Sequence, residues 1–288
     1  MIKYFDNAAT TKLDSEVLNE MLPYLTENYA NPSSIYSVGK AAKEAITIAR
    51  MKIAEAIGAN VNEIYFTSCG SESDNLAIKG IAFANSRYGN HIITSSIEHP
   101  AVLNTCKFLE DMGFRVTYLK PNSSGIIDIQ SVKKAITPKT ILISIMFANN
   151  EIGTLQPIKE IAEIARRNNI YFHTDAVQAM GNIKVNVKEL NISALSMSAH
   201  KFYGPKGVGV LYVKDGVNFK RIQDGGHQER EKRSGTENVA GIVGTGKALE
   251  IATRHLESNI KKMKTLRDYY LENIKIKIPN IRINGDLE

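Results

Sequence analysis

Residues 157–175 read PIKEIAEIARRNNIYFHTD, and this stretch decides the fold class. Residues 157–168 place apolar side chains at the three- and four-residue spacing of an amphipathic helix. Residues 170–174 form a short, mostly apolar run, which is typical of a strand covered on both faces. Because the same alternation recurs along the chain, the sequence predicts an α/β fold with a mostly parallel sheet.

Seven strands and four helices are expected in the part of the chain that precedes Gly235. Beyond it, one long helical stretch is expected from Thr236 to about Asn273, and residues 281–283 are expected to begin a further strand. The expected strands are 63–67, 91–95, 115–119, 140–147, 170–174, 194–197 and 209–213, and the expected helices are 37–57, 73–84, 101–112 and 157–168.

Composition excludes several classes of protein. The 288 residues suit about two domains, and 43% hydrophobic with 23% charged residues is ordinary for a globular chain. A disordered chain, a collagen-like chain and a disulfide-stapled miniprotein are excluded. The formal net charge of +6 comes from basic residues spread along the chain, so neither nucleic-acid binding nor a membrane partner is expected.

Cysteine content and apolar runs indicate the compartment. The chain has two cysteines, Cys69 and Cys106, which are too few for a disulfide framework and suit a reducing environment. No apolar run approaches the roughly 20 residues that a membrane span needs. The first eleven residues, MIKYFDNAATT, lack the unbroken apolar stretch of a signal peptide. A cytoplasmic protein is therefore expected.

Lys201 lies in SMSAHKFYGPKG, residues 196–207, directly after an expected strand. The segment has no helical periodicity, and glycine and proline follow the lysine. A lysine just past a strand end, beside a ligand crevice, is where an α/β enzyme places a Schiff-base amine. An ordinary surface-loop lysine is the alternative that these residues leave open.

Asp175 ends the buried run 170–174 in the sequence HTDAVQ. A buried carboxylate is unfavourable unless it is paired. Pairing with the protonated pyridine nitrogen of pyridoxal phosphate would stabilise it and keep the ring an electron sink. Capping the N-terminus of a helix would satisfy the same side chain, so both interpretations stay open.

Three further segments follow expected strands. In TSCGSESD, residues 67–74, a strand ends and a helix begins, so free backbone N–H groups suit a phosphate. His99 could stack on a flat cofactor or be a structural histidine, and Asn150 offers an amide. Because the carboxyl ends of parallel strands form one crevice, these segments together predict a pyridoxal phosphate site.

The sequence resembles the cysteine desulfurases of the NifS/IscS type, which are class V aminotransferases of fold type I. The resemblance runs from residue 4 to the last residue. The matching stretches are FDNAATT (5–11), NPSS (31–34), FTSCGSESDNLAIKG (66–80), EHPAVL (98–103), NNEIGTLQPI (149–158), HTDAVQ (173–178), SAHKFYGPKGVG (198–209) and RSGTEN (233–238).

The resemblance implies a role for each candidate site residue. Lys201 would carry the cofactor as a Schiff base, Asp175 would pair with the pyridine nitrogen, and His99 would stack on the ring and help move protons. The phosphate would be held by Gly70, Ser71, Ser198 and His200, and the ring hydroxyl and substrate side would be contacted by Gln178 and Asn150. Thr236 would reach the phosphate of a neighbouring subunit, which implies a homodimer.

The implied reaction takes sulfur from L-cysteine, leaving L-alanine and a persulfide on an enzyme cysteine, with a sulfur-acceptor scaffold protein as a plausible partner. In this family the persulfide cysteine and the arginine for the substrate carboxylate lie beyond the last residue here, so impaired activity is expected. Cys69 and Cys106 are interpreted as small packing residues. The alternatives are a selenocysteine lyase, another aminotransferase, or a non-catalytic fragment that binds the cofactor.

The resemblance also implies two domains of the aspartate aminotransferase type. Residues 15–255 are expected to form the large cofactor-binding domain with its seven-stranded sheet. Residues 1–14 and 256–288 are expected to belong to a small α+β domain that is incomplete in this chain.

Overall fold

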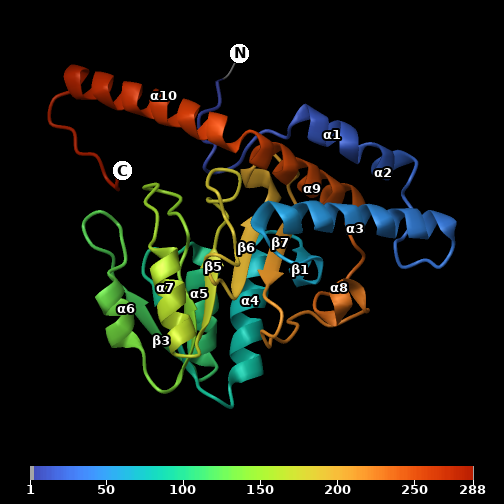
Figure 1. The fold of residues 1–288 in the computed structure, drawn as a ribbon, viewed down its shortest axis with the longest axis horizontal. Helices are drawn as coiled ribbons and strands as arrows, with labels where there is room; N and C mark the ends of the chain where they lie inside the picture. The colour runs from blue at the N-terminus through green and yellow to red at the C-terminus, as the bar shows by residue number, and fades with distance from the viewer. Residues whose placement is uncertain (1–2, 288) are drawn as a thin grey trace.

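The computed structural model describes residues 3–287, and its centre is a seven-stranded sheet of order β1-β7-β6-β5-β4-β2-β3 (Figure 1). β7 runs antiparallel to both β1 and β6, and the other neighbouring pairs are parallel. The strands are β1 (Ile64–Thr67), β2 (His91–Ser95), β3 (Arg115–Leu119), β4 (Thr140–Ser144), β5 (Tyr171–Asp175), β6 (Ala194–Ser198) and β7 (Gly209–Val213).

This topology confirms the expected α/β class and places six carboxyl ends at one edge. Because β7 is reversed between β1 and β6, those two strands run in the same direction as the rest. All seven expected strands are present, although β4 ends three residues earlier than expected. The loops that leave β1, β2, β4, β5 and β6 therefore meet at one edge of the sheet.

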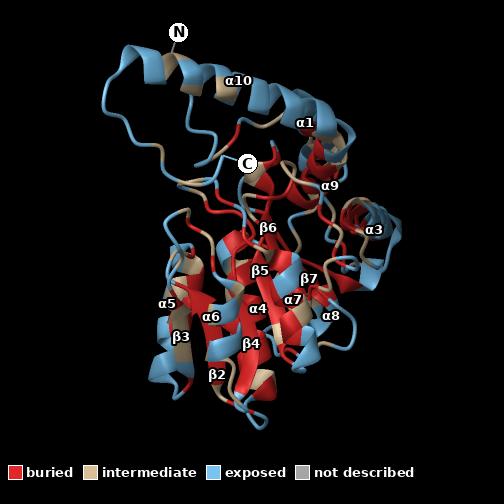
Figure 2. Cartoon of the chain, turned by 60° about the vertical axis from the view of Figure 1, so that its left-hand side comes forward, coloured by how far each residue is buried: buried red, intermediate tan, exposed pale blue. Residues whose placement is uncertain are grey.

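Helices cover both faces of the sheet. On one face, α4 (Gly70–Asn85) and α5 (Pro100–Asp111) pack on buried strand residues such as Leu142 and Leu211. On the other face, α7 (Ile158–Arg167), α3 (Ser37–Ile57) and α9 (Val239–Arg254) share a larger apolar core. Figure 2 shows the buried strands between these layers. The sheet is therefore buried on both sides, as the apolar strands indicate.

Local signals explain several helix ends. α3 ends at Gly58, which adopts a left-handed conformation with φ 69°. α5 begins with Pro100 after His99, and α6 (Ile129–Ala135) begins after Asp128, whose carboxylate accepts two backbone N–H groups. The remaining short elements are α1 (Ser15–Met21), α2 (Pro23–Thr26), η1 (Val61–Glu63), η2 (Ala199–Lys201) and α8 (Gln228–Glu231).

The expected single helix from Thr236 to Asn273 is wrong. α9 ends and α10 (Leu256–Lys277) begins around His255, whose dihedral angles are φ −102° and ψ 9°. α9 is buried against α3, whereas no residue of α10 is buried, and Figure 2 shows α10 as an exposed helix. Packing against the rest of the protein stabilises α9 but not α10, and the spacing of apolar residues in the sequence does not distinguish the two segments.

The expected strand at residues 281–283 is also wrong. These residues form no strand and pair with none of the seven strands in the described part of the chain. A two- or three-residue apolar run is too short to form a strand without a neighbour to pair with. Separately, no helix within residues 3–287 is long and apolar enough to cross a membrane.

Candidate active site

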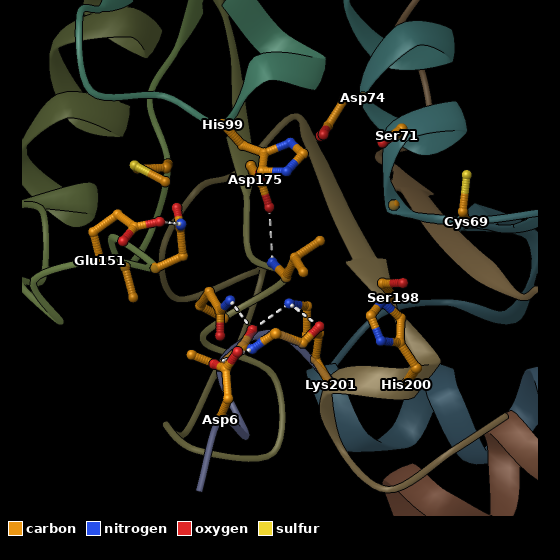
Figure 3. Close-up of a pocket in the computed structure, with 18 residues that line it drawn as sticks. Asp6, Cys69, Ser71, Asp74, His99, Glu151, Asp175, Ser198, His200 and Lys201 are labelled. Atoms are coloured by element: carbon orange, nitrogen blue, oxygen red, sulfur yellow. Dashed lines mark hydrogen bonds between the residues drawn. The ribbon is translucent and has the colours of Figure 1, made fainter. Parts of the chain in front are cut away.

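A cavity of about 530 Å³ opens at the carboxyl edge of the sheet, and Figure 3 shows its lining. The loops after five strands contribute to it, together with the N-terminal segment that contains Asp6. It brings together every sequence-predicted site residue except Thr236: Gly70, Ser71, His99, Asn150, Asp175, Gln178, Ser198, His200 and Lys201.

Lys201 ends η2, directly after β6. Its amine donates hydrogen bonds to the backbone carbonyls of Ala8 and Ala9, the latter at 2.9 Å. Burial lowers the pKa of the amine, and the nearby carboxylates of Asp175 and Asp6 oppose that shift. A lysine with a lowered pKa has a larger neutral, nucleophilic fraction near neutral pH.

Asp175 is the last residue of β5 and is 5% exposed. Its Oδ1 accepts the Val177 backbone N–H at 2.9 Å. Burial raises its pKa, while the Val177 hydrogen bond and the charges of His99 and Lys201 act in the opposite direction. The carboxylate therefore faces a cavity in which a cationic partner would stabilise its charged form.

His99 caps the N-terminus of α5, and its Nδ1 accepts the Ala101 backbone N–H at 3.1 Å. Figure 3 shows its ring beside Asp175, on the opposite side of the cavity from Lys201. The preceding residue, Glu98, is buried and accepts hydrogen bonds at Oε1 from Ser95 Oγ (2.6 Å) and the Met146 N–H (2.9 Å). These bonds fix the loop that presents the imidazole.

Gly70 and Ser71 open α4, where the first backbone N–H groups have no partner inside the helix. A Cβ on Gly70 would lie 2.9 Å from Val177 Cγ2 and 3.3 Å from Ser198 Cβ. Glycine therefore lets the helix start approach these two loops closely. Such a helix start is suited to an anionic group.

His200 faces this helix start from the loop after β6, as Figure 3 shows. Its Nδ1 and Thr10 Oγ1 are 3.0 Å apart. Burial and the positive charges of Lys201 and Lys206 lower its pKa. The neutral form of the imidazole is therefore favoured at this wall of the cavity.

Two amide side chains line the remaining wall. Gln178 Nε2 donates to the Ala8 carbonyl at 3.0 Å, and Asn150 Nδ2 donates to Glu151 Oε1 at 2.7 Å. Thr236 lies apart from them. It is exposed and lines a separate cavity of about 100 Å³ with Ser68 and Arg233.

Sequence reasoning gave no site role to Asp6, Ala8 or Ala9, although the FDNAATT match contains them. Residues 10–14 are joined to the loop after β6 by hydrogen bonds, among them Thr11 N–H to the His200 carbonyl (2.9 Å) and Asp14 N–H to the Tyr203 carbonyl (3.1 Å). No local signal predicts a contact across about 190 positions. Asp74 and Cys69 also line the cavity.

Comparison with known proteins shows the family. The model of the class-V aminotransferases matches residues 3–288. The chain belongs to the class-V aminotransferase family. A cysteine desulfurase IscS of Methanosarcina thermophila is 59% identical over 98% of this chain and 70% of its own length, and one of Clostridium botulinum is 55% identical over 98% and 71%. This class-V aminotransferase is thus of the NifS/IscS type.

Solved structures agree with that grouping. A NifS-like protein superimposes with a TM-score of 0.93 at 42% identity, covering 95% of this chain and 76% of its own. A structure of SspA in complex with cysteine gives a TM-score of 0.84 at 49% identity, covering 86% and 72%. The fold type I architecture expected from the sequence is confirmed.

Pyridoxal phosphate is the cofactor of class-V aminotransferases, and the residues present fit it. A lysine amine, a buried carboxylate and a glycine-opened helix start line one cavity, which also holds the His99 ring. Among residues 3–287, no group of three or more His, Cys, Asp or Glu side chains is arranged to hold a metal ion. The donor set thus offers partners for an aldehyde, a ring nitrogen and a phosphate.

Proposed function

We propose that this protein is a pyridoxal phosphate-dependent cysteine desulfurase, which takes L-cysteine as substrate and passes its sulfur to a thiol. The observation that carries the proposal is the convergence of Lys201, Asp175 and His99 in the one cavity at the carboxyl edge. The identity to cysteine desulfurases, 59% and 55% over 98% of the chain, supports the choice of reaction.

The cofactor, when bound, supplies an electron-accepting ring that allows bonds at an amino-acid α-carbon to break. Lys201 would hold the cofactor through its amine and, when that amine is free, would accept a proton, because the lowered pKa favours the neutral base. Asp175 would pair with the ring nitrogen and favour its protonated form. His99 would contact the ring and assist proton movement, and its hydrogen bond from the Ala101 N–H keeps the imidazole in place.

The phosphate is assigned to the start of α4 and the loop after β6, through Gly70, Ser71, Ser198 and His200. Neutral side-chain donors and the backbone N–H groups of the helix start can hold the phosphate there without a positively charged side chain. Gln178 and Asn150 are assigned to the ring hydroxyl and the substrate side.

The two cysteines differ as sulfur acceptors. Cys106 is buried, and burial raises its pKa to about 12, so it is not a nucleophile near neutral pH. Cys69 lines the cavity and is partly exposed, but it lies at the helix start assigned to the phosphate and is treated as a packing residue. Neither cysteine is therefore proposed as the thiol that accepts the sulfur.

Assembly and location are further parts of the proposal. Thr236 is exposed and is assigned to the phosphate of a second subunit, so a homodimer is proposed. Residues 15–255 are proposed as the large domain, and residues 1–14 and 256–288 as part of the small domain. A sulfur-acceptor scaffold protein is the proposed partner, and the cytoplasm, inferred from the low cysteine content, is the proposed location.

The deciding experiment is the visible absorption of the purified protein supplied with pyridoxal phosphate. The wild-type protein and Lys206→Ala, a control in the same loop, should give a yellow band and, after borohydride reduction, a mass increase on the peptide that contains Lys201. Lys201→Ala should show neither. A colourless wild-type protein, or label at another lysine, would contradict the site assignment.

Products then separate the alternatives. L-cysteine should change the band of the wild-type protein and yield L-alanine with sulfide in the presence of a thiol. Preferential turnover of selenocysteine indicates a selenocysteine lyase, and turnover that needs an oxo acid indicates an aminotransferase. A band without turnover of any of the three indicates a cofactor-binding protein without desulfurase activity.

A further inference from the structure

A layer of polar side chains lies beneath Asp175, between β5 and α4. His173 and Asp175 are two residues apart on β5, so they project from the same face of the sheet. α4 packs on that face, and Asp74 in its first turns places Oδ1 3.6 Å from His173 Nε2. Figure 3 shows Asp74 near Asp175 at the cavity. The catalytic roles proposed above use neither Asp74 nor His173.

His173 is fully buried and joins three strands. Its Nδ1 lies 2.8 Å from Ser144 Oγ on β4, and its Nε2 lies 2.9 Å from Ser196 Oγ on β6. Both ring nitrogens therefore have a hydroxyl partner. In a neutral ring, one serine hydroxyl donates to the bare nitrogen and the other accepts the N–H of the second nitrogen. Burial lowers the pKa of His173 to about 3. The ring is neutral across the working pH range.

Asp74 has a 2% exposed side chain, and its Oδ1 has no hydrogen-bond partner among the described residues. An ionised carboxylate in this position would be a buried charge without a cation or a full set of donors, which is strongly unfavourable. Burial, reinforced by the negative charge of Asp175, raises the pKa of Asp74 well above its usual range, against the opposing effect of a hydrogen bond from Ser196. The missing hydrogen-bond partner at Oδ1 and the direction of this shift both favour the protonated form of the carboxyl group.

We propose that Asp74 and His173 form an uncharged layer that leaves Asp175 as the anionic carboxylate available to the cofactor's ring nitrogen, with Asp74 acting as a positioning residue. This inference rests on the proposed function, because it assigns Asp175 to the ring nitrogen. If Asp74 were ionised, its negative charge would raise the pKa of Asp175, so Asp175 would be less able to stay ionised beside the ring nitrogen.

The titratable groups around Asp175 come from the loop before α5, from η2, from the loop before α4 and from α4 itself. The groups that act on Asp175 or on Asp74 are His99 at the start of α5, Lys201 in η2, Glu98 in the loop before α5, Cys69 before α4, and Asp74 itself. Glu98 is also buried, with Oε2 unpartnered. Lys201 and His99 act on Asp175, whereas none of these cationic groups acts on Asp74, so an ionised Asp74 would have no cation among them to balance its charge.

Infrared difference spectroscopy tests the protonation of Asp74 directly. The spectrum of the wild-type protein minus that of Asp74→Asn should contain the C=O stretch of a protonated carboxylic acid at pH 7, shifted in D₂O, without a carboxylate band. Asp111→Asn, which removes an exposed carboxylate, should show the reverse pattern. Loss of a carboxylate band in Asp74→Asn would overturn the proposal.

The titration of the cofactor band provides an independent readout. Asp74→Asn should leave its midpoint within about 0.3 pH unit and the cofactor Kd within about threefold of the wild-type values, because one neutral group replaces another. Asp175→Asn should weaken cofactor binding at least about tenfold. A midpoint lowered by about one unit or more in Asp74→Asn would show that Asp74 is an anion.

A measurement on the wild-type protein keeps the test independent of folding of the variant. With ¹³C-labelled aspartate carboxyl groups, a buried aspartate should keep its signal at the protonated position at pH 7, and ¹⁵N-labelled histidine should show at least one ring that stays neutral at pH 5. Absence of the protonated aspartate signal would overturn the proposal. If the protein binds no cofactor, the proposed function fails, while the infrared and NMR results still decide the state of Asp74.

Discussion

The Arg50 guanidinium donates two hydrogen bonds to the Glu229 carboxylate, from Nη1 to Oε2 at 2.7 Å and from Nη2 to Oε1 at 2.6 Å. Both side chains are buried, and they join the long helix α3 to α8, more than 170 positions away. Glu229 has φ 46°, in the left-handed region that is unfavourable for residues other than glycine. The buried pair offsets that backbone strain and fixes the loop that leads to Thr236.

Breaking this pair should destabilise the protein strongly. Arg50→Met leaves the Glu229 charge buried with the Phe66 N–H as its one remaining hydrogen-bond donor among residues 3–287, so the free energy of unfolding should fall by about 3–5 kcal/mol. Urea unfolding measures it. The double variant Arg50→Met/Glu229→Met should lose less than the sum of the single losses. Arg221→Met, which breaks an exposed pair with Asp224, is the control and should lose less than about 1 kcal/mol.

Glu98 should make stability depend on pH. Burial raises its pKa to about 8 from an ordinary value of 4.5, so the folded state holds a proton that the unfolded state releases between these values. Wild-type stability should therefore fall as pH rises from 5 to 8, relative to Glu98→Gln, by up to about 1.4 kcal/mol per pH unit. Urea unfolding at a series of pH values measures the difference, and a flat difference would contradict a protonated Glu98.

Asp6 should tune the amine of Lys201. Its negative charge raises the pKa of Lys201 against the effect of burial, so Asp6→Asn should lower that pKa by less than about one unit, since Asp6 is exposed. The pH dependence of amine labelling, followed on the peptide containing Lys201, should move to lower pH. Asp111→Asn, remote from the cavity, should leave the profile in place, and an upward shift in Asp6→Asn would be inconsistent with the structure.

α10 should be less protected than α9 although both are long helices. α9 has ten buried residues and packs on α3, whereas α10 has none. Amide hydrogens of α10 should exchange at least about 100-fold faster than those in the centre of α9. Hydrogen exchange followed by mass spectrometry resolves the two segments. Equal protection would mean that α10 is covered in solution, for example by a second copy of the chain.

Many of the helices and strands can be predicted from neighbouring residues in the sequence. The helix at residues 37–57 and the strand at 91–95 were predicted with their observed bounds, because apolar spacing and the glycine at position 58 are properties of the neighbouring residues. The helix around residues 73–84 begins three residues earlier than predicted, since Gly70 and Ser71 carry no apolar signal. The break at His255 was missed because it depends on which helix finds a partner.

The sequence by itself determined the α/β class and which residues follow the strands, and that was enough to place Lys201 and Asp175 at one edge. Only the tertiary structure decided that β7 is reversed between β1 and β6, that Asp6, Ala8 and Ala9 reach the cavity, and that Asp74 lies over His173. The reason is physical: strand and helix periodicity come from neighbouring residues, whereas these arrangements come from packing and hydrogen bonds between segments tens to hundreds of positions apart.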